Sequence, residues 1–192
     1  PEDIQQALAA AGRVSTRGCV LTNEVILQVV LAMGVLTDLP IRQVFKHARR
    51  LREGERSPAR SNHCMARRRL GVAPVRQLFV QVVRSLAQPD TPGAFYRGLR
   101  LMGIDGVVND VSDSAANSAA FGRPTGGPRG DGAFAQIREL SLAELGTHVE
   151  IALVVKSCRT GEQAMVAGLL RDMSPEMPLP WVSKAHPFQL PS

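Results

Sequence analysis

The sequence predicts an α+β protein, in which an all-α amino-terminal domain is followed by three strands and a helix. Apolar residues repeat at helical spacing up to about residue 87, and they alternate with a period of two between residues 134 and 155. The charge changes sign as well. Residues 1–100 carry 16 Lys and Arg against 7 Asp and Glu, a net +9, whereas residues 101–192 carry 7 against 10, a net −3. We therefore expect two domains, the first of which is suited to a polyanion.

Five helices are expected in the amino-terminal domain. Thr22 or Asn23 can cap the second helix, and Ser57 or Ser61 can begin the fourth, because such side chains accept hydrogen bonds from the free N–H groups of a first turn. Gly71 suits the end of the fourth helix. The expected helices span about residues 2–11, 23–33, 41–51, 57–70 and 74–87.

Basic side chains are concentrated in the third and fourth of these helices. Between Arg42 and Arg76 there are 11 basic residues, ten of them Arg, and only two acidic ones. The planar guanidinium group fits phosphates and guanine edges, which favours nucleic acid as the partner. A solvated helical surface that only keeps the protein soluble is the alternative. The residues expected to bind DNA are Arg49, Arg50, Arg60, Ser61, His63, Arg67, Arg68 and Arg69.

The segment 60–69 has the size of a recognition helix, with polar residues at its start that could read a DNA groove. The other interpretation is a helix that lies across phosphates without reading bases. His63 and Cys64 do not predict a zinc site, because adjacent helical residues point apart and no second pair follows at zinc-finger spacing. For His63 a role in the core or at the surface is favoured over metal binding.

The carboxyl-terminal half predicts a small sheet. Residues 99–104 form a short apolar strand, which places Asp105 at the end of a buried strand. Residues 112–132 are rich in Gly, Ser and Asn and predict a long loop. Asp110 and Asp113 lie in a turn-like stretch at its start, where Asp is common because it forms local hydrogen bonds. Strands at about 134–145 and 149–155, joined by a Gly146-Thr147 turn, are followed by a helix at 161–171. Its expected buried residues are Met165, Val166, Leu169 and Leu170.

Several motifs of the chain together resemble the insertion element 4 family of transposases, over roughly residues 1–175. The match is densest around Ile104-Asp105-Gly106. The other segments that carry it are Ala66-Arg67-Arg68-Arg69-Leu70-Gly71, residues 91–98, Asp110-Val111-Ser112-Asp113, residues 116–124, Arg129-Gly130, Gly146-Thr147-His148 and Arg159-Thr160-Gly161-Glu162.

The resemblance implies a helical DNA-binding domain over residues 1–97 and the first part of a ribonuclease H-like domain over residues 98–172. In such transposases, Asp, Asp and Glu hold two Mg²⁺ ions, with Mn²⁺ as the alternative, that activate water or a 3′ hydroxyl for attack on a phosphodiester. Asp105 corresponds to the first carboxylate, both catalytic and metal-binding. The implied partners are double-stranded DNA at insertion-element ends and a second copy or a full-length transposase, in the bacterial cytoplasm and nucleoid.

The sequence departs from the family after residue 172. Prolines at 175, 178 and 180 stand where a central strand is expected, and prolines interrupt the ladder of a sheet. We expect residues 173–192 to be an irregular tail, either disordered or out of frame. The chain should then be a truncated transposase that binds DNA but neither holds the metal nor cuts alone. A DNA-binding regulator or inhibitor of transposition is one alternative, and a fragment completed by carboxylates of another polypeptide is the other.

The remaining composition predicts a cytoplasmic protein without a membrane span. The longest apolar run, residues 25–36, is about half of what a bilayer requires. Three widely spaced cysteines suggest neither a disulfide framework nor a CxxC zinc site.

Overall fold

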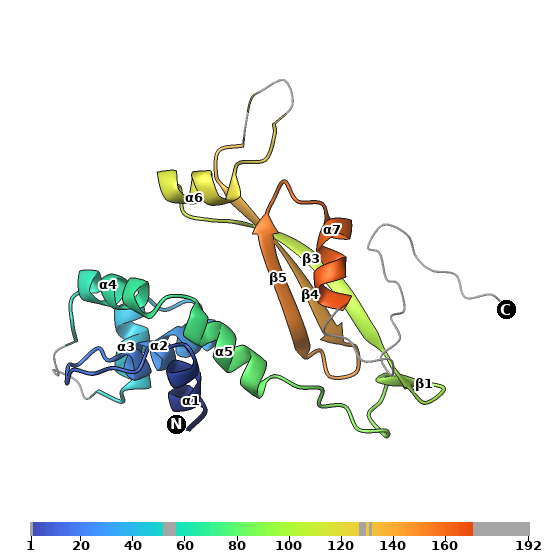
Figure 1. Ribbon diagram of the computed structural model, residues 1–192, viewed down its shortest axis with the longest axis horizontal. Helices are drawn as coiled ribbons and strands as arrows, with labels where there is room; N and C mark the ends of the chain where they lie inside the picture. Colours follow the sequence, from blue (N-terminus) through green and yellow to red (C-terminus); the bar gives the residue numbers. More distant parts are fainter. Residues whose placement is uncertain (1, 52–56, 127–129, 131, 171–192) are drawn as a thin grey trace. The chain divides into compact units, whose positions relative to one another are not determined.

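The computed structural model describes residues 2–51, 57–126, 130 and 132–170. It forms two compact units, Pro1–Val83 and the part of the chain from Arg84, called here the helical unit and the sheet unit (Figure 1). The sequence placed this division at residue 97. Residues 84–97 belong with the sheet, because the N–H groups of Leu86 and Ala87 donate to the carboxylate of Glu144, at 3.1 and 2.8 Å. The tail expected over residues 173–192 lies outside the described residues.

The helical unit consists of the five expected helices. They are α1 (Glu2–Ala10), α2 (Asn23–Val35), α3 (Ile41–Ala48), α4 (Arg60–Leu70) and α5 (Ala73–Val82). Helix α2 packs against α1, α3 and α4, and α5 packs against α1. One apolar core joins all five helices, and its largest fully buried members are Phe45, Leu8, Ile26, Leu27 and Leu70.

Three helix ends test the expected caps. Thr22 caps α2, because its hydroxyl accepts a hydrogen bond from the Val25 N–H at 3.3 Å. Gly71 ends α4 with a φ of +72°, a left-handed conformation that favours glycine. The expected start of α4 was wrong, since Ala59 occupies the cap position in place of Ser57 or Ser61. Helix α5 also ends before Ala87, because Val83 is already extended.

The sheet unit is built on three antiparallel strands in the order β3-β4-β5. These are β3 (Met102–Asp110), β4 (Gln136–Glu144) and β5 (Glu150–Ser157), with a β-bulge between Leu142 and Ala143. Helix α7 (Glu162–Leu170) covers one face of the strands (Figure 1). Met165 and Leu169 are its buried residues, while Leu170, which the sequence also expected inside, is exposed. The core on this face contains Met102, Leu140, Leu142, Ala152, Met165 and Leu169.

Three features of this unit differ from the sequence prediction. Strands β1 (Phe95–Tyr96) and β2 (Leu99–Arg100) form a separate short hairpin, so the first long strand begins only at Met102. That strand continues through Asp105 to Asp110, because all nine of its residues pair with β4. The segment expected to be a loop contains α6 (Ala115–Phe121), capped by the Ser114 hydroxyl, which accepts from the Asn117 N–H at 3.2 Å.

A buried carboxylate joins the parts of the sheet unit. The Glu144 side chain is fully buried at the end of β4 and forms an ion pair with Arg100. It also accepts hydrogen bonds from the Thr147 hydroxyl and from two backbone N–H groups at residues 86 and 87. Burial raises the pKa of Glu144, but these donors outweigh burial and hold the pKa below its ordinary value. One ionised side chain therefore connects residues 86 and 87, strand β2 and the turn between β4 and β5.

Candidate nucleic-acid interface and carboxylate face

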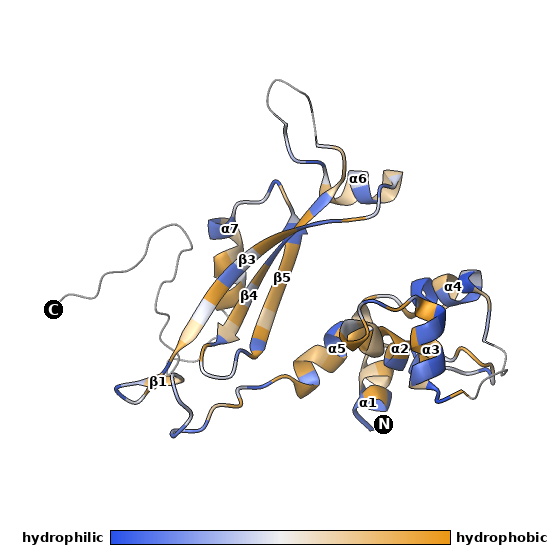
Figure 2. Cartoon of the chain, turned by 180° about the vertical axis from the view of Figure 1, so that it is seen from behind, coloured by the Kyte–Doolittle hydropathy of each residue, from blue (hydrophilic) through white to orange (hydrophobic). Residues whose placement is uncertain are grey.

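The helical unit carries an exposed set of arginines on α3 and α4 and just after α3. We call it the basic surface; its members are Arg42, Arg49, Arg50, Arg60, Arg67 and Arg68, all of them exposed. In Figure 2 both helices have long hydrophilic stretches. No arginine of this surface forms an ion pair with a described residue. The segment from Arg42 to Arg76 has 11 basic residues and two acidic ones, Glu53 and Glu55, which lie outside the described residues.

Arg50 sits where the chain leaves α3. Its φ of +50° is in the left-handed region and stops the helix, whose last residue is Ala48. Arg49, Arg50 and Arg60 thus flank the connection between α3 and α4.

Arg69 has a structural role that the sequence did not reveal. Its Nε donates to the Asn23 side-chain oxygen at 3.2 Å, and its Nη2 donates to the Leu21 carbonyl. The Asn23 amide in turn donates to the Arg13 carbonyl at 2.7 Å. Arg69 therefore connects α4 to the start of α2.

His63 lies inside the helical unit, with none of its surface exposed. Its ring contacts the edge of the Phe45 ring, with centroids 5.0 Å apart and an interplanar angle of 63°. Neither ring nitrogen has a hydrogen-bond partner among the described residues. Burial lowers the pKa of His63, the Pro58 backbone raises it, and the charge of Arg42 lowers it further, with a net decrease. His63 is a neutral core residue, so its expected place at the DNA surface is corrected.

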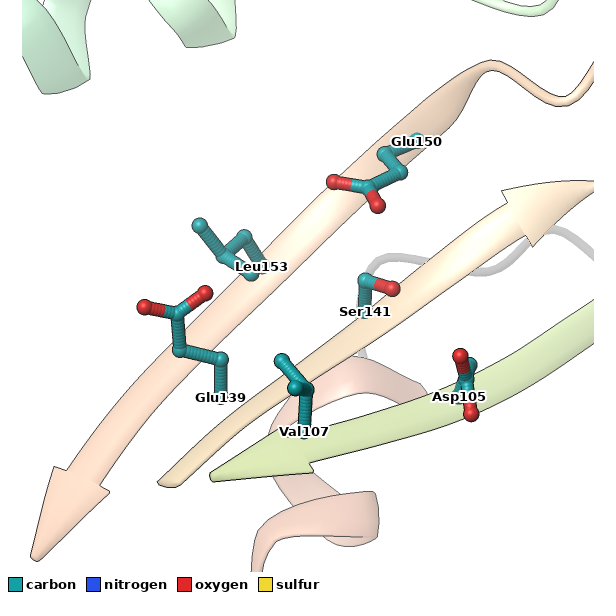
Figure 3. Close-up of a pocket in the computed structure, with 6 residues that line it drawn as sticks. All are labelled: Asp105, Val107, Glu139, Ser141, Glu150 and Leu153. Carbon is teal, nitrogen blue, oxygen red and sulfur yellow. The ribbon is translucent and has the colours of Figure 1, made fainter. Parts of the chain in front are cut away.

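The sheet unit presents a second candidate region on the face opposite α7. Strand alternation places Asp105 and Val107 of β3 on this face, with Glu139 and Ser141 of β4. Leu153 and Glu150 of β5 complete it, and the six side chains line one depression (Figure 3). We call this the carboxylate face. Asp105 pairs with Ser141 across the strands and lies in the middle of β3, which corrects its expected position at a strand end.

The carboxylate face by itself does not fit a two-metal site. Among the described residues, no group of three His, Cys, Asp or Glu side chains is arranged to hold a metal ion. The Asp105 carboxylate accepts a hydrogen bond from the Gly106 N–H at 3.0 Å. Glu139 and Glu150 lie on the same face of the sheet as Asp105, which can be recognised only from the pairing of the strands. Within the described residues the carboxylate face therefore lacks a three-ligand metal site, and we derive no metal-dependent step from it.

Asp110 and Asp113 contact side chains distant in the sequence, which corrects the local roles expected in a turn, and Asp110 is the last residue of β3. Asp110 accepts a hydrogen bond from the Gln136 side chain at 2.8 Å. Asp113 forms an ion pair with Arg123 at 2.6 Å, which holds the connection after α6.

Residues 1–80 match the family described as "Insertion element 4 transposase N-terminal". The amino-terminal region is similar to this family. The matched residues, 1–80, are almost the same as those of the helical unit, Pro1–Val83. The resemblance drawn from the sequence is confirmed.

A curated relative extends the likeness into the sheet unit. The chain is 26% identical over 172 residues to a protein of Escherichia coli (strain K12) named "Putative transposase InsZ". The aligned region covers 88% of this chain and 56% of that protein, so the chain spans about half the length of the curated relative it matches. No solved structure matches the chain. None of the helices in the described ranges is long and apolar enough to cross a bilayer.

Proposed function

We propose that this chain is the DNA-binding part of an insertion element 4 transposase, with double-stranded DNA at insertion-element ends as its ligand. The observation that carries the proposal is the coincidence of two features. The family match covers residues 1–80, and nearly the same residues form a compact unit with a basic surface, in a segment that has 11 basic and only two acidic residues between Arg42 and Arg76. Acting on such DNA would place the protein at the bacterial nucleoid.

The electrostatics of the basic surface favour a polyanion over a small ligand. Its arginines come from two helices and the connection between them, and every one of them is exposed to solvent. Each arginine that neutralises a phosphate releases condensed counterions, which makes the affinity fall with rising salt. Because His63 is buried and Arg69 binds α2, we assign the phosphate contacts to the exposed arginines.

The test is fluorescence anisotropy of a labelled duplex with the purified full chain at several salt concentrations. Four phosphate contacts, from Arg49, Arg50, Arg60 and Arg67, would give a log–log slope of about −3 to −4. Replacing one of them, as in Arg50→Ala, should make the slope shallower by about 0.9. Arg97→Ala is the control, because Arg97 is an exposed arginine of the sheet unit whose described contact is the Tyr96 ring. A salt-independent affinity, or an equal effect of the control, would refute DNA binding by this surface.

We further propose that the sheet unit is the beginning of the ribonuclease H-like domain, with Asp105 as the first carboxylate of its Mg²⁺ or Mn²⁺ site. Its support is the position of Asp105 in the first long strand, facing away from α7 and beside two other carboxylates. When bound, the metal ions would activate the attacking oxygen and stabilise the leaving one. Because the described carboxylates do not form that site alone, two further ligands must join Asp105.

A DNA-binding regulator that lacks catalysis, alone or paired with a full-length transposase, is the second candidate. It requires only the basic surface of the helical unit. Incubation of an end-labelled duplex with the chain and Mg²⁺ separates the two proposals, with Asp105→Asn as the control. Binding without cleavage supports the regulator. Cleavage that Asp105→Asn abolishes supports the catalytic proposal, whereas cleavage that Asp105→Asn leaves intact removes Asp105 from the chemistry.

A further inference from the structure

The outer face of α4 differs from the other basic surfaces of the helical unit. Three residues of α4 are buried, His63, Ala66 and Leu70, and their spacing defines the inward direction of the helix. At 100° per residue, the positions opposite this stripe are Ser61, Cys64, Met65 and Arg68. All four are exposed, and Met65 is exposed by 68%. We call these four residues the outer face of α4.

The two edges of this face have different surroundings. Arg60 and Arg67 lie along one edge, both exposed. Asn62 and Arg69 lie along the other edge, where Arg69 is held by Asn23 and the Leu21 carbonyl. The outer face itself thus has three uncharged side chains and one arginine, Arg68. Exposed arginines that bind no other described side chain lie along only one of its edges, at Arg60 and Arg67. Helix α3 instead exposes Arg42, and Arg49 and Arg50 follow it, so that long cations dominate its surroundings.

We propose that α4 enters the major groove of DNA with its outer face toward the base edges. This inference rests on the proposed DNA-binding function and names the part of the protein that reads sequence. The major groove is about 12 Å wide and admits an α-helix. Reading bases requires side chains that permit close approach, and the centre of this face has them, whereas a surface of long cations alone would stay at the phosphates.

Each residue of the outer face matches a known type of base contact. The Arg68 guanidinium can donate two hydrogen bonds to O6 and N7 of guanine, and the Ser61 hydroxyl can donate or accept. Met65 and Cys64 present apolar surface that suits the 5-methyl group of thymine. Arg67 and Arg60, at the edge, then contact phosphates, together with Arg49 and Arg50. The expected site therefore contains a guanine and a thymine.

Arg67 and Arg68 give a matched pair of variants, because they are neighbouring arginines of one helix and both are exposed. The experiment begins with selection of bound duplexes from a library with a randomised segment, using the full chain. Affinities of each variant are then measured for the selected duplex and for a scrambled one. We expect Arg68→Ala to lower the ratio of the two affinities by roughly 5- to 150-fold, the range for one bidentate base contact. Arg67→Ala should weaken both affinities to the same extent and leave the ratio unchanged.

The contact of Met65 has its own test. Replacing the selected thymine by deoxyuridine removes only the 5-methyl group. The wild-type chain should lose several-fold in affinity, and the Met65→Ala variant should bind the two duplexes equally. Helix content of each variant, measured by circular dichroism, confirms that the helical unit remains folded.

The outcomes distinguish this inference from the function on which it rests. A lowered ratio for Arg68→Ala alone supports the assignment of the outer face. Equal effects of Arg67→Ala and Arg68→Ala on both duplexes overturn it, because α4 then lies across phosphates while DNA binding stands. A wild-type chain that binds no duplex in the selection overturns the proposed function itself.

Discussion

Replacing Glu144 by glutamine should destabilise the sheet unit by about 3 kcal/mol, the lower end of the cost of breaking a buried ion pair. The side chain has no exposed surface, and that of its partner Arg100 is 21% exposed. The glutamine keeps the volume but loses the negative charge, so the hydrogen bonds from two backbone N–H groups and from Arg100 are weakened. The guanidinium of Arg100 would then be left half-buried without its counterion.

Hydrogen exchange of the full chain, followed by mass spectrometry, measures this change locally. A loss of 3 kcal/mol corresponds to roughly 150-fold faster exchange in β3, β4 and β5 if they open as one unit. Glu139→Gln is the matched control, because it changes the same residue type on the same strand but on the carboxylate face. Exchange in α1 to α5 should be unchanged in both variants. Less than fivefold acceleration in the strands would refute the view that Glu144 ties this unit together.

The lowered pKa of Glu144 gives the same prediction a pH dependence. A carboxyl whose folded pKa lies below its unfolded value stabilises the fold above the unfolded pKa, about 4.3, and loses that contribution as the pH falls through the folded pKa. The stability difference between wild type and Glu144→Gln should therefore be full at pH 7 and shrink below about pH 4. Thermal unfolding at both pH values measures it, and a difference that grows on acidification would contradict the assigned sign.

Two further substitutions test the packing of the units. His63→Leu should make the stability of the helical unit less sensitive to acid. The pKa of His63 is lowered in the folded state, so the unfolded chain takes up the proton first and the free energy of unfolding decreases as the pH falls below about 6.5. Unfolding midpoints of wild type and variant with the same pH dependence would exclude this role. Gly146→Ala should destabilise the sheet unit by about 2 kcal/mol, because its new Cβ would lie 2.4 Å from the Cβ and 2.8 Å from the Cα of Ala94. Gly161→Ala, whose Cβ would meet nothing within 4 Å, is the control and should leave the unfolding midpoint unchanged.

Local patterns of the sequence predicted the five helices of the helical unit, helix α7 and the second and third long strands well, but they missed α6. Helical spacing located all five helices of the helical unit, because each buries one stripe against α2 or α1. Alternation located β4 and β5, since one of their faces is buried under α7. The start of α4 was misplaced because neither of the two nearby serines occupies its cap position. The end of α5 was misplaced because the chain is already extended at Val83. Such ends are set by tertiary packing.

Asp105 shows what local patterns could not predict. An Asp-Gly pair resembles the end of a strand, since both residues are common in turns. The strand continues because Val107 and Val108 pair with Glu139 and Arg138 of β4, which lies some 30 residues later in the chain. Glu144 was missed for the same reason. A lone glutamate in a strand suggests exposure, and only its distant donors make its burial favourable.

The three consecutive arginines of α4, Arg67, Arg68 and Arg69, differ in ways that the sequence alone does not predict. The sequence assigns all three to DNA, since residue type and neighbours are the same for each. Successive residues of a helix point 100° apart, so the phase of α4 against the core separates them. The burial of His63, Ala66 and Leu70 sets that phase: it turns Arg69 toward α2, directs Arg68 outward and leaves Arg67 at the edge. If α4 binds DNA with its outer face, the positions of its buried residues determine which arginine can contact a base.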